Sequence, residues 1–307
     1  MDIALLGIPI EAGNSVPGTL MGPAALRTAG LAAMLAELGH QVRDLGDVGI
    51  GTIAAAAPAG LETCRNPAEV AAWTEAIHDR SLAMLGTGEF PVFLGGDHAL
   101  SMGTLSALSR HCRERDRDLV VLWLDAHADF NTPQSSPSGN MHGMSLTFLT
   151  GDPSLRNMLP NRDWPALPTS AIHIFGLRSI DREERQRLDD HEVDCIDMRA
   201  IDEHGVSLLM RELLARLDPT RTHLHVSLDV DFLDPSLGPA VGTTVPGGAT
   251  YREAHLAMEM LHDSGLVGSL EIVELNPFLD ERGRTARLMA ELAASLFGRT
   301  VLDRRTR

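Results

Sequence analysis

Cysteine is scarce in this chain of 307 residues. Cys64, Cys112 and Cys195 are odd in number, lie far apart in the sequence and form no C-x-x-C pair. This usage indicates neither a disulfide framework nor a thiolate zinc site, and it favours a reducing cytoplasm as the setting of the protein.

Long apolar runs are missing as well. No uncharged apolar stretch reaches the roughly 18 residues that a membrane-spanning helix needs. Residues 1–7 have no basic segment, and their apolar run is too short for a secretory signal. We therefore expect a cytoplasmic protein with no membrane partner.

Positive charge is also in short supply. The chain has 26 Lys and Arg against 42 Asp and Glu, a formal net charge of −16. Such a balance argues against nucleic acid or an anionic membrane surface as the partner. A cationic substrate or a divalent metal ion fits it better than such an anionic partner, although solubility accounts for most of the excess charge.

The remaining composition is that of an ordinary globular protein, with 44% hydrophobic and 22% charged residues. Apolar runs and helical periodicities alternate along the whole chain. Strands are predicted at residues 3–6, 41–44, 90–94, 120–124, 171–175, 193–196, 222–228 and 267–273, and helices at 23–38, 66–85, 101–111, 203–217 and 285–297, with further helices starting near 181 and 250. A basic tail is expected at 304–307. This alternation predicts one α/β domain over residues 1–307, with a mainly parallel sheet and helices on both faces.

The strand predicted at 120–124 ends in an unusual cluster of polar residues. Asp125, His127 and Asp129 alternate with two alanines. If the backbone stays extended there, all three side chains leave the same face of the strand. The stretch is therefore either a metal-binding strand end or a solvated turn.

Three more predicted strands end in acids or histidines. Asp97 and His98 follow residues 90–94, Asp229 and Asp231 follow 222–228, and Glu274 follows 267–273. In parallel sheets, ligands bind beyond the carboxyl ends of the strands, which share one edge. We expect these side chains to meet there.

Four carboxylates gathered in one small site would repel each other unless cations neutralise them. Two divalent ions would balance the charges of Asp125, Asp129, Asp229 and Asp231, and His98 and His127 would complete the ligand set. An oxygen-rich set with imidazoles favours two Mn²⁺ ions, with Co²⁺, Ni²⁺ or Fe²⁺ as alternatives. Such a pair lowers the pKa of a bridging solvent molecule, so hydrolysis is the expected reaction, with Asp129 orienting the hydroxide.

Two further residues have alternative interpretations. His142 follows in a glycine-containing loop and is either an ordinary satisfied histidine or a proton shuttle. Glu274 either forms a salt bridge with Arg282 or Arg284, or pairs with a planar cationic substrate such as a guanidinium group.

These motifs together resemble the ureohydrolase (arginase–agmatinase) family, and within it the arginase branch. The resemblance covers nearly the whole chain. The matching segments are Met21-Gly22-Pro23, Gly95-Gly96-Asp97-His98, Asp125-Ala126-His127-Ala128-Asp129, Ser138-Gly139-Asn140-Met141-His142-Gly143, Ser227-Leu228-Asp229-Val230-Asp231, Gly247-Gly248-Ala249-Thr250-Tyr251-Arg252-Glu253 and Glu274-Leu275-Asn276-Pro277.

The resemblance implies the three-layer αβα fold of that family and a binuclear manganese enzyme. Its reaction would be hydrolysis of the guanidinium group of L-arginine to L-ornithine and urea by a metal-bridging hydroxide. One metal would be held by His98, Asp125, Asp129 and Asp229, and the other by Asp125, His127, Asp229 and Asp231. His142 matches the proton shuttle, Glu274 matches the glutamate that receives the guanidinium, and the family implies a homotrimer or homohexamer.

The same resemblance implies which residues recognise the amino-acid end of the arginine substrate. Asn131, Ser136 and Ser138 match positions that contact the substrate carboxylate, and Asp181 and Glu184 match positions near its α-ammonium. Thr243 matches a further substrate-contacting position. Because agmatine has no carboxylate, these residues favour arginine over agmatine.

Three other functions stay open on the sequence. The chain could be an agmatinase or another ureohydrolase of guanidino acids. It could also be a zinc deacetylase with one metal and a tyrosine, although the single tyrosine, Tyr251, falls in a predicted helix cap. Finally, it could be a metal-binding protein without catalysis, but such a protein needs neither His142 nor Glu274.

Overall fold

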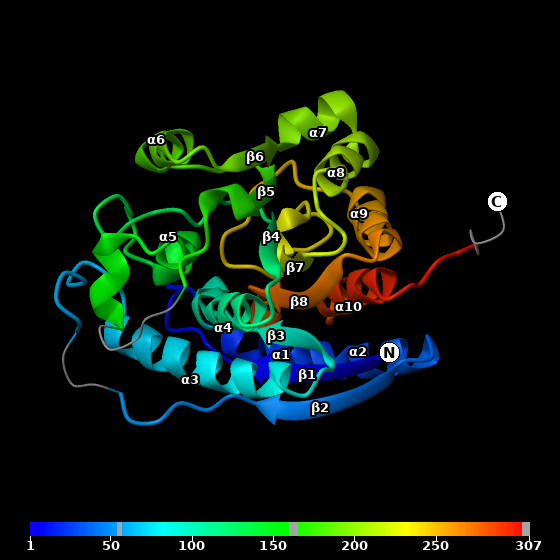
Figure 1. Ribbon diagram of the computed structural model, residues 1–307, viewed down its shortest axis with the longest axis horizontal. Coiled ribbons are helices and arrows are strands. Elements are labelled where there is room, and N and C mark those ends of the chain that lie inside the picture. The colour runs from blue at the N-terminus through cyan, green and yellow to red at the C-terminus, as the bar shows by residue number, and fades with distance from the viewer. Residues whose placement is uncertain (54–56, 160–164, 303–307) are drawn as a thin grey trace.

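A computed structural model describes residues 1–53, 57–159 and 165–302 (Figure 1). Its centre is an eight-stranded sheet in the order β2-β1-β3-β8-β7-β4-β5-β6, in which every neighbouring pair is parallel. The strands are β1 (Asp2–Ile8), β2 (Gln41–Asp47), β3 (Phe90–Gly95), β4 (Asp118–Leu124), β5 (Ile172–Leu177), β6 (Asp194–Asp197), β7 (Thr222–Asp229) and β8 (Val267–Val273).

Helices connect the strands and cover both faces of the sheet. They are α1 (Gly22–Thr28), α2 (Leu31–Glu37), α3 (Pro67–Leu85), α4 (Ser101–Arg113), α5 (Ser145–Leu149), α6 (Arg182–Asp190), α7 (Met198–His204), α8 (Val206–Ala215), α9 (Tyr251–Ser264) and α10 (Arg284–Leu296). None of those in the described residues combines the length and hydropathy needed to cross a bilayer. The basic tail expected at 304–307 lies outside the described residues.

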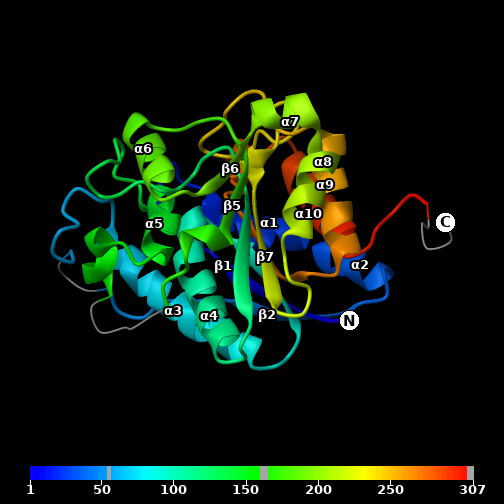
Figure 2. The ribbon, with the colours of Figure 1, turned by 45° about the horizontal axis from the view of Figure 1, so that its top comes forward.

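The apolar side chains divide into two cores, one on each face of the sheet. Along β4, Leu122 and Leu124 pack into the core beneath α1, α2 and α7–α10, whereas Val121 and Trp123 pack into the core beneath α3–α6. Figure 2 shows the sheet between these two groups of helices. Strands that are buried on both faces read as continuous apolar runs, which is why the sequence predicts them well. The expected three-layer α/β fold is confirmed.

Two helices predicted as continuous are broken. The segment 23–38 forms α1 and α2, separated at Gly30 with φ 89°, and the segment 203–217 falls on α7 and α8, separated at Gly205 with φ 76°. A positive φ is readily adopted only by glycine, and it ends a right-handed helix. The apolar periodicity continues across both glycines, so the prediction of single helices was wrong.

Replacement of Gly30 by alanine tests whether this break depends on the left-handed backbone. No heavy atom lies within 4 Å of the added methyl group, so the cost would come from φ alone. We expect Gly30→Ala to lower the free energy of unfolding by about 1 kcal/mol in urea denaturation. Gly86→Ala is the matched control, since Gly86 has φ −67° at the end of α3 and should be neutral or stabilising. Equal stability of the two variants would contradict the prediction.

The strand order places the polar strand ends next to each other. β3, β8, β7, β4 and β5 are consecutive neighbours in the sheet, and their carboxyl ends lie at one edge. His98 follows β3, Glu274 follows β8, Asp229 ends β7 and Asp125 follows β4. The fold therefore brings together residues that are far apart in the sequence.

Candidate metal centre

The acidic segment after β4 is a turn rather than a continuation of the strand. β4 ends at Leu124, and the N–H of His127 donates to Asp125 Oδ1 over 2.6 Å. Asp129 has a left-handed backbone with φ 48°. The expectation of one extended face was therefore wrong. The three side chains approach the same region because the chain curls, with aspartate stabilising its own turn.

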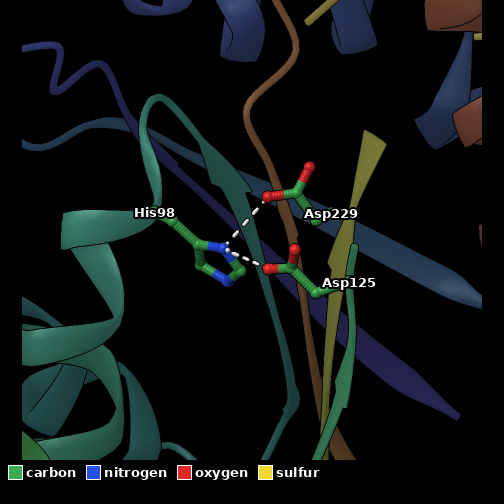
Figure 3. Close-up of side chains that lie close together, drawn as sticks. All are labelled: His98, Asp125 and Asp229. Atoms are coloured by element: carbon green, nitrogen blue, oxygen red, sulfur yellow. Dashed lines mark ion pairs between the residues drawn. The ribbon is translucent and has the colours of Figure 1, made fainter. Parts of the chain in front are cut away.

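One group of ligand atoms surrounds Nδ1 of His98. This nitrogen lies 3.1 Å from Asp125 Oδ2, 3.2 Å from Asp129 Oδ2 and 3.0 Å from Asp229 Oδ2, and all four side chains are buried. Figure 3 shows His98 facing the carboxylates of Asp125 and Asp229. These residues come from three different strand ends.

The ring of His98 is fixed by its surroundings. It stacks on Trp123, with ring centroids 3.9 Å apart and planes within 2°, and its Nε2 lies 2.8 Å from Ser227 Oγ. If Nε2 carries the proton and donates to Ser227, Nδ1 keeps its lone pair toward the carboxylates. A hydrogen bond at the far nitrogen is the usual way in which proteins orient a metal-binding histidine.

A second group lies around His127. Its Nδ1 is 3.0 Å from Asp231 Oδ2 and 3.5 Å from Asp125 Oδ1. Asp231 is held by the N–H of Ala126, which donates to Oδ1 over 3.0 Å, and by the hydroxyl of Thr243, which donates to Oδ2 over 3.1 Å. Asp125 belongs to both groups and offers one oxygen to each.

The electrostatics of the two groups favour bound cations. In the described part of the chain, His98 Nδ1 and Asp125 Oδ2 are buried and have no hydrogen-bond partner. Burial and the neighbouring carboxylates of Asp231 and Asp125 raise the pKa of Asp229, and burial and Asp125 raise the pKa of Asp231 to about 6. Divalent ions would satisfy the orphaned atoms and remove the repulsion, so this set of oxygens and imidazoles fits metal ions.

His142 and Glu274 form a buried pair beside the first group. Glu274, which is 1% exposed, lies 2.8 Å from His142 Nδ1 through Oε1. Burial alone would lower the pKa of His142, but the Glu274 carboxylate outweighs it and raises this pKa to about 9. His142 is therefore the ionisable partner of Glu274. The expected salt bridge of Glu274 with Arg282 or Arg284 was wrong, and Arg284 instead donates to the carbonyl of Ser236.

Glu274 has little unused capacity for hydrogen bonds. Besides the contact with His142, Oε1 accepts the N–H of His98 over 2.8 Å, and Oε2 accepts Nδ2 of Asn14 over 2.9 Å. A carboxylate has about four lone-pair directions, so roughly one is left. A guanidinium could therefore reach Glu274 through one N–H, and a bidentate pair would require Asn14 or His142 to move.

The residues expected at the amino-acid end fall into two sets. Asn131 Nδ2 donates to Asp181 Oδ2 over 3.2 Å, which joins a carboxylate-binding candidate to an ammonium-binding candidate. Ser136 and Ser138 lie together in the following loop, with hydroxyl oxygens 3.5 Å apart; Ser136 is partly exposed and Ser138 is exposed. The contact between Asn131 and Asp181 forms one set, and the loop that carries Ser136 and Ser138 forms the other.

Glu184 differs from the others because the backbone occupies it. The side chain is 4% exposed, Oε1 accepts the N–H of Phe130 over 2.8 Å, and Oε2 accepts the N–H of Asp181 over 3.4 Å. Burial raises the pKa of Glu184 to about 7. Both carboxylate oxygens of Glu184 thus accept hydrogen bonds from backbone groups of the protein.

Two residues around the site, Asn14 and Arg178, were missed in the sequence, whereas Asp97 was expected at this edge of the sheet. Asn14 lies in the glycine-rich loop after β1, where no pattern marks it. Asp97 accepts the N–H groups of Gly13 and Ala99, and burial with the nearby Glu274 raises its pKa to about 7. Arg178 donates to the carbonyls of Gly176, Leu233 and Val245, and its place directly after β5 was the one available signal.

A parallel α/β sheet with carboxylates and imidazoles clustered beyond its carboxyl edge defines a class of α/β metalloenzymes. Comparison with known proteins narrows the class, because a sequence model of the Arginase family matches residues 1–298. The chain belongs to the arginase family and is a hydrolase of that family. Members of this family are binuclear metal enzymes, and the two groups around Asp125 are candidate ligands for such a centre.

Individual relatives agree with this placement. An arginase of Agrobacterium fabrum is 50% identical over 302 residues, covering 98% of this chain and 92% of the relative. An arginase of Brucella melitensis is 49% identical over 313 residues, covering 100% of this chain and 99% of the relative. The solved structure of arginase from Bacillus caldovelox is 38% identical and superimposes with a TM-score of 0.89, covering 98% of this chain and 99% of that one.

Proposed function

We propose that this chain hydrolyses the guanidinium group of L-arginine to L-ornithine and urea at a binuclear manganese centre. The observation that supports it most is Asp125, which offers one buried oxygen to each of two groups of ligand atoms. Identity of 49–50% to arginases over nearly the full chain supports arginine as the substrate.

The family resemblance divides the metal ligands into two sets. The clusters of His98, Asp125 and Asp229 and of Asp125, His127 and Asp231 support this division, whereas Asp229 in the second set rests on the resemblance. His98, Asp125, Asp129 and Asp229 would hold one ion, and Asp125, His127, Asp229 and Asp231 the other. Hard carboxylate oxygens with two imidazoles suit Mn²⁺, while Co²⁺, Ni²⁺ or Fe²⁺ could replace it. When bound, the two ions supply hydroxide near neutral pH by lowering the pKa of water.

The side chains around the metal ligands carry the remaining steps. Asp129 would orient the attacking oxygen by accepting its hydrogen bond. That oxygen would bond to the guanidinium carbon and pass its proton to Asp129, while the bond from this carbon to the side-chain nitrogen of arginine breaks and urea forms. His142, held through Nδ1 by Glu274, would deliver a proton to the departing amine, which leaves as ornithine, and Glu274 would attract the positive guanidinium.

Selectivity for an amino acid would come from the residues that match the family's contacts to the amino-acid end of the substrate. Asp181 suits an α-ammonium, whereas Asn131, Ser136 and Ser138 offer neutral donors to a carboxylate. Thr243, hydrogen-bonded to Asp231, would contact the substrate beside the second metal. Agmatine lacks the carboxylate and would leave these donors without a partner, so we expect a preference for arginine.

The test is a substrate panel on metal-loaded protein. After incubation with Mn²⁺ and removal of free metal, we expect two metal ions per chain and equal release of urea and ornithine from L-arginine. Turnover of agmatine or guanidinobutyrate without turnover of arginine would reject the substrate. One tightly bound zinc ion with amide hydrolysis would favour a deacetylase, and two bound metals without any turnover would favour a non-catalytic protein.

We also propose that residues 1–307 form one domain and that the protein works in the cytoplasm, as its alternating elements and its cysteine usage indicate. The family resemblance implies a homotrimer or homohexamer. Analytical ultracentrifugation of the metal-loaded protein measures the assembly directly. A monomer at micromolar concentration would contradict this part of the proposal.

A further inference from the structure

The peptide units of Phe130 join the two halves of the proposed site. Asp129, which precedes Phe130, faces His98, and Asn131, which follows it, contacts Asp181. Any movement of Phe130 would therefore displace a candidate metal ligand and a candidate substrate contact together.

Helix α6 holds Phe130 by both of its backbone polar groups. Glu184 Oε1 accepts the N–H of Phe130 over 2.8 Å, and Arg187 Nε donates to its carbonyl over 3.2 Å. Glu184 and Arg187 are three residues apart and so lie on the same side of the helix. One helical turn thus satisfies both hydrogen-bonding groups of a buried loop residue.

The Phe130 side chain is enclosed by the same helix. Its ring is fully buried, with the Arg187 guanidinium carbon 5.2 Å from the ring centroid. The ring of His191, which directly follows α6, meets it edge-on at 5.5 Å. Arg187 is itself anchored, because its Nη2 donates to Asp152 over 2.9 Å. A cation over an aromatic face contributes about 0.5–2 kcal/mol, depending on its desolvation.

The backbone next to Phe130 needs such support. Asp129 has φ 48°, a conformation that costs a non-glycine residue about 1–2 kcal/mol. On the other side of this segment, the carbonyl of Asp129 accepts the N–H of Leu146 over 3.0 Å, and the N–H of Asn131 donates to Gly143 over 3.1 Å. Helix α6 supplies the contacts to the residue between them.

We propose that Arg187 is a positioning residue for this reaction. With Glu184 it holds Phe130 and so fixes Asp129 toward the metal ligands and Asn131 toward the amino-acid end of the substrate. This assignment rests on the proposed function, and it gives Glu184 the role of a support for Phe130 and Asp181. Arg187 determines how well the site recognises an amino acid, without contacting the substrate itself.

Arg187→Met is the decisive variant, because methionine keeps an unbranched side chain but removes every donor. Arg185→Met is the matched control, because it makes the same substitution at an exposed position of the same helix. We expect Arg187→Met to weaken L-ornithine binding about tenfold, as loss of supporting contacts commonly does. Binding of guanidinium chloride should stay within about twofold, and Arg185→Met should resemble the unsubstituted protein in both affinities.

Calorimetry on manganese-loaded protein measures both affinities without turnover, and hydrogen exchange at Phe130 reports on the loop directly. Selective loss of ornithine binding with faster exchange at Phe130 in Arg187→Met would support the proposal. Unchanged exchange and affinity would overturn it, as would equal weakening of both ligands or the same effect in Arg185→Met. Failure of the proposed function would appear differently, as no urea release by the unsubstituted protein, and the exchange measurement would still decide the role of Arg187.

Discussion

Asp125→Asn should lower kcat/KM for L-arginine by about 10³-fold, roughly 4 kcal/mol of transition-state stabilisation. Asp125 Oδ2 faces His98 and Oδ1 faces His127, so each oxygen serves a different group of ligands. Asparagine keeps one oxygen and replaces the other by an NH₂ group, which donates hydrogen bonds and has no lone pair for a metal. One of the two groups would lose its shared ligand whichever way the amide turns.

The same variant should retain fewer than two metal ions after dialysis. Metal content by mass spectrometry and initial rates of urea release, measured on the same preparation, check both effects. Asp202→Asn is the control, since Asp202 is an exposed carboxylate on α7. Retention of two metals together with a rate within a few-fold of the unsubstituted protein would show that Asp125 is not the shared ligand.

The strands and the long helices were predictable from local sequence. β4 follows directly from an apolar run, and α3 follows from an Asn-Pro start with regular periodicity, because the pattern of consecutive residues reflects the burial of these elements. The interruptions at Gly30 and Gly205 were not predictable in this way. An isolated glycine is tolerated within a helix, and its positive φ here depends on how the two segments pack on the sheet.

The metal ligands were predictable for a different reason. Each follows the carboxyl end of a buried strand, and the parallel arrangement brings those ends to one edge. Their supports were not predictable, because they come from distant segments without a pattern of their own. Asn14 reaches Glu274 across 260 positions, and Arg187 reaches Phe130 across 57. The sequence shows that these residues are an asparagine and an arginine, but it does not show which distant residue each one contacts.

The pair of His142 and Glu274 leads to the second large effect. Glu274→Gln removes the charge that raises the pKa of His142 and offers it an uncharged amide instead. We expect kcat/KM for L-arginine to fall about 10²–10³-fold, since both a positioned proton donor and the attraction for the guanidinium are weakened. His142→Asn should cost a similar factor, because asparagine cannot deliver the proton.

The two residues should act as one unit. If His142 works through its contact with Glu274, the double variant loses little more activity than the worse single variant, whereas independent roles give losses that multiply. The effect of the Glu274 charge on His142 can be measured separately as the pKa of His142. In the metal-free protein, the pKa of His142 followed by NMR should lie near 9 and fall toward the ordinary value of about 6.5 in Glu274→Gln.

The sign of the effect on stability follows from the raised pKa. A histidine whose pKa is higher in the folded state stabilises that state fully below its unfolded pKa of about 6.5, and this contribution disappears as the pH rises through about 9. The stability lost in Glu274→Gln should therefore be larger at pH 6 than at pH 10 in urea denaturation of metal-free protein. A difference independent of pH, together with multiplying losses of activity, would show that the two side chains merely lie side by side.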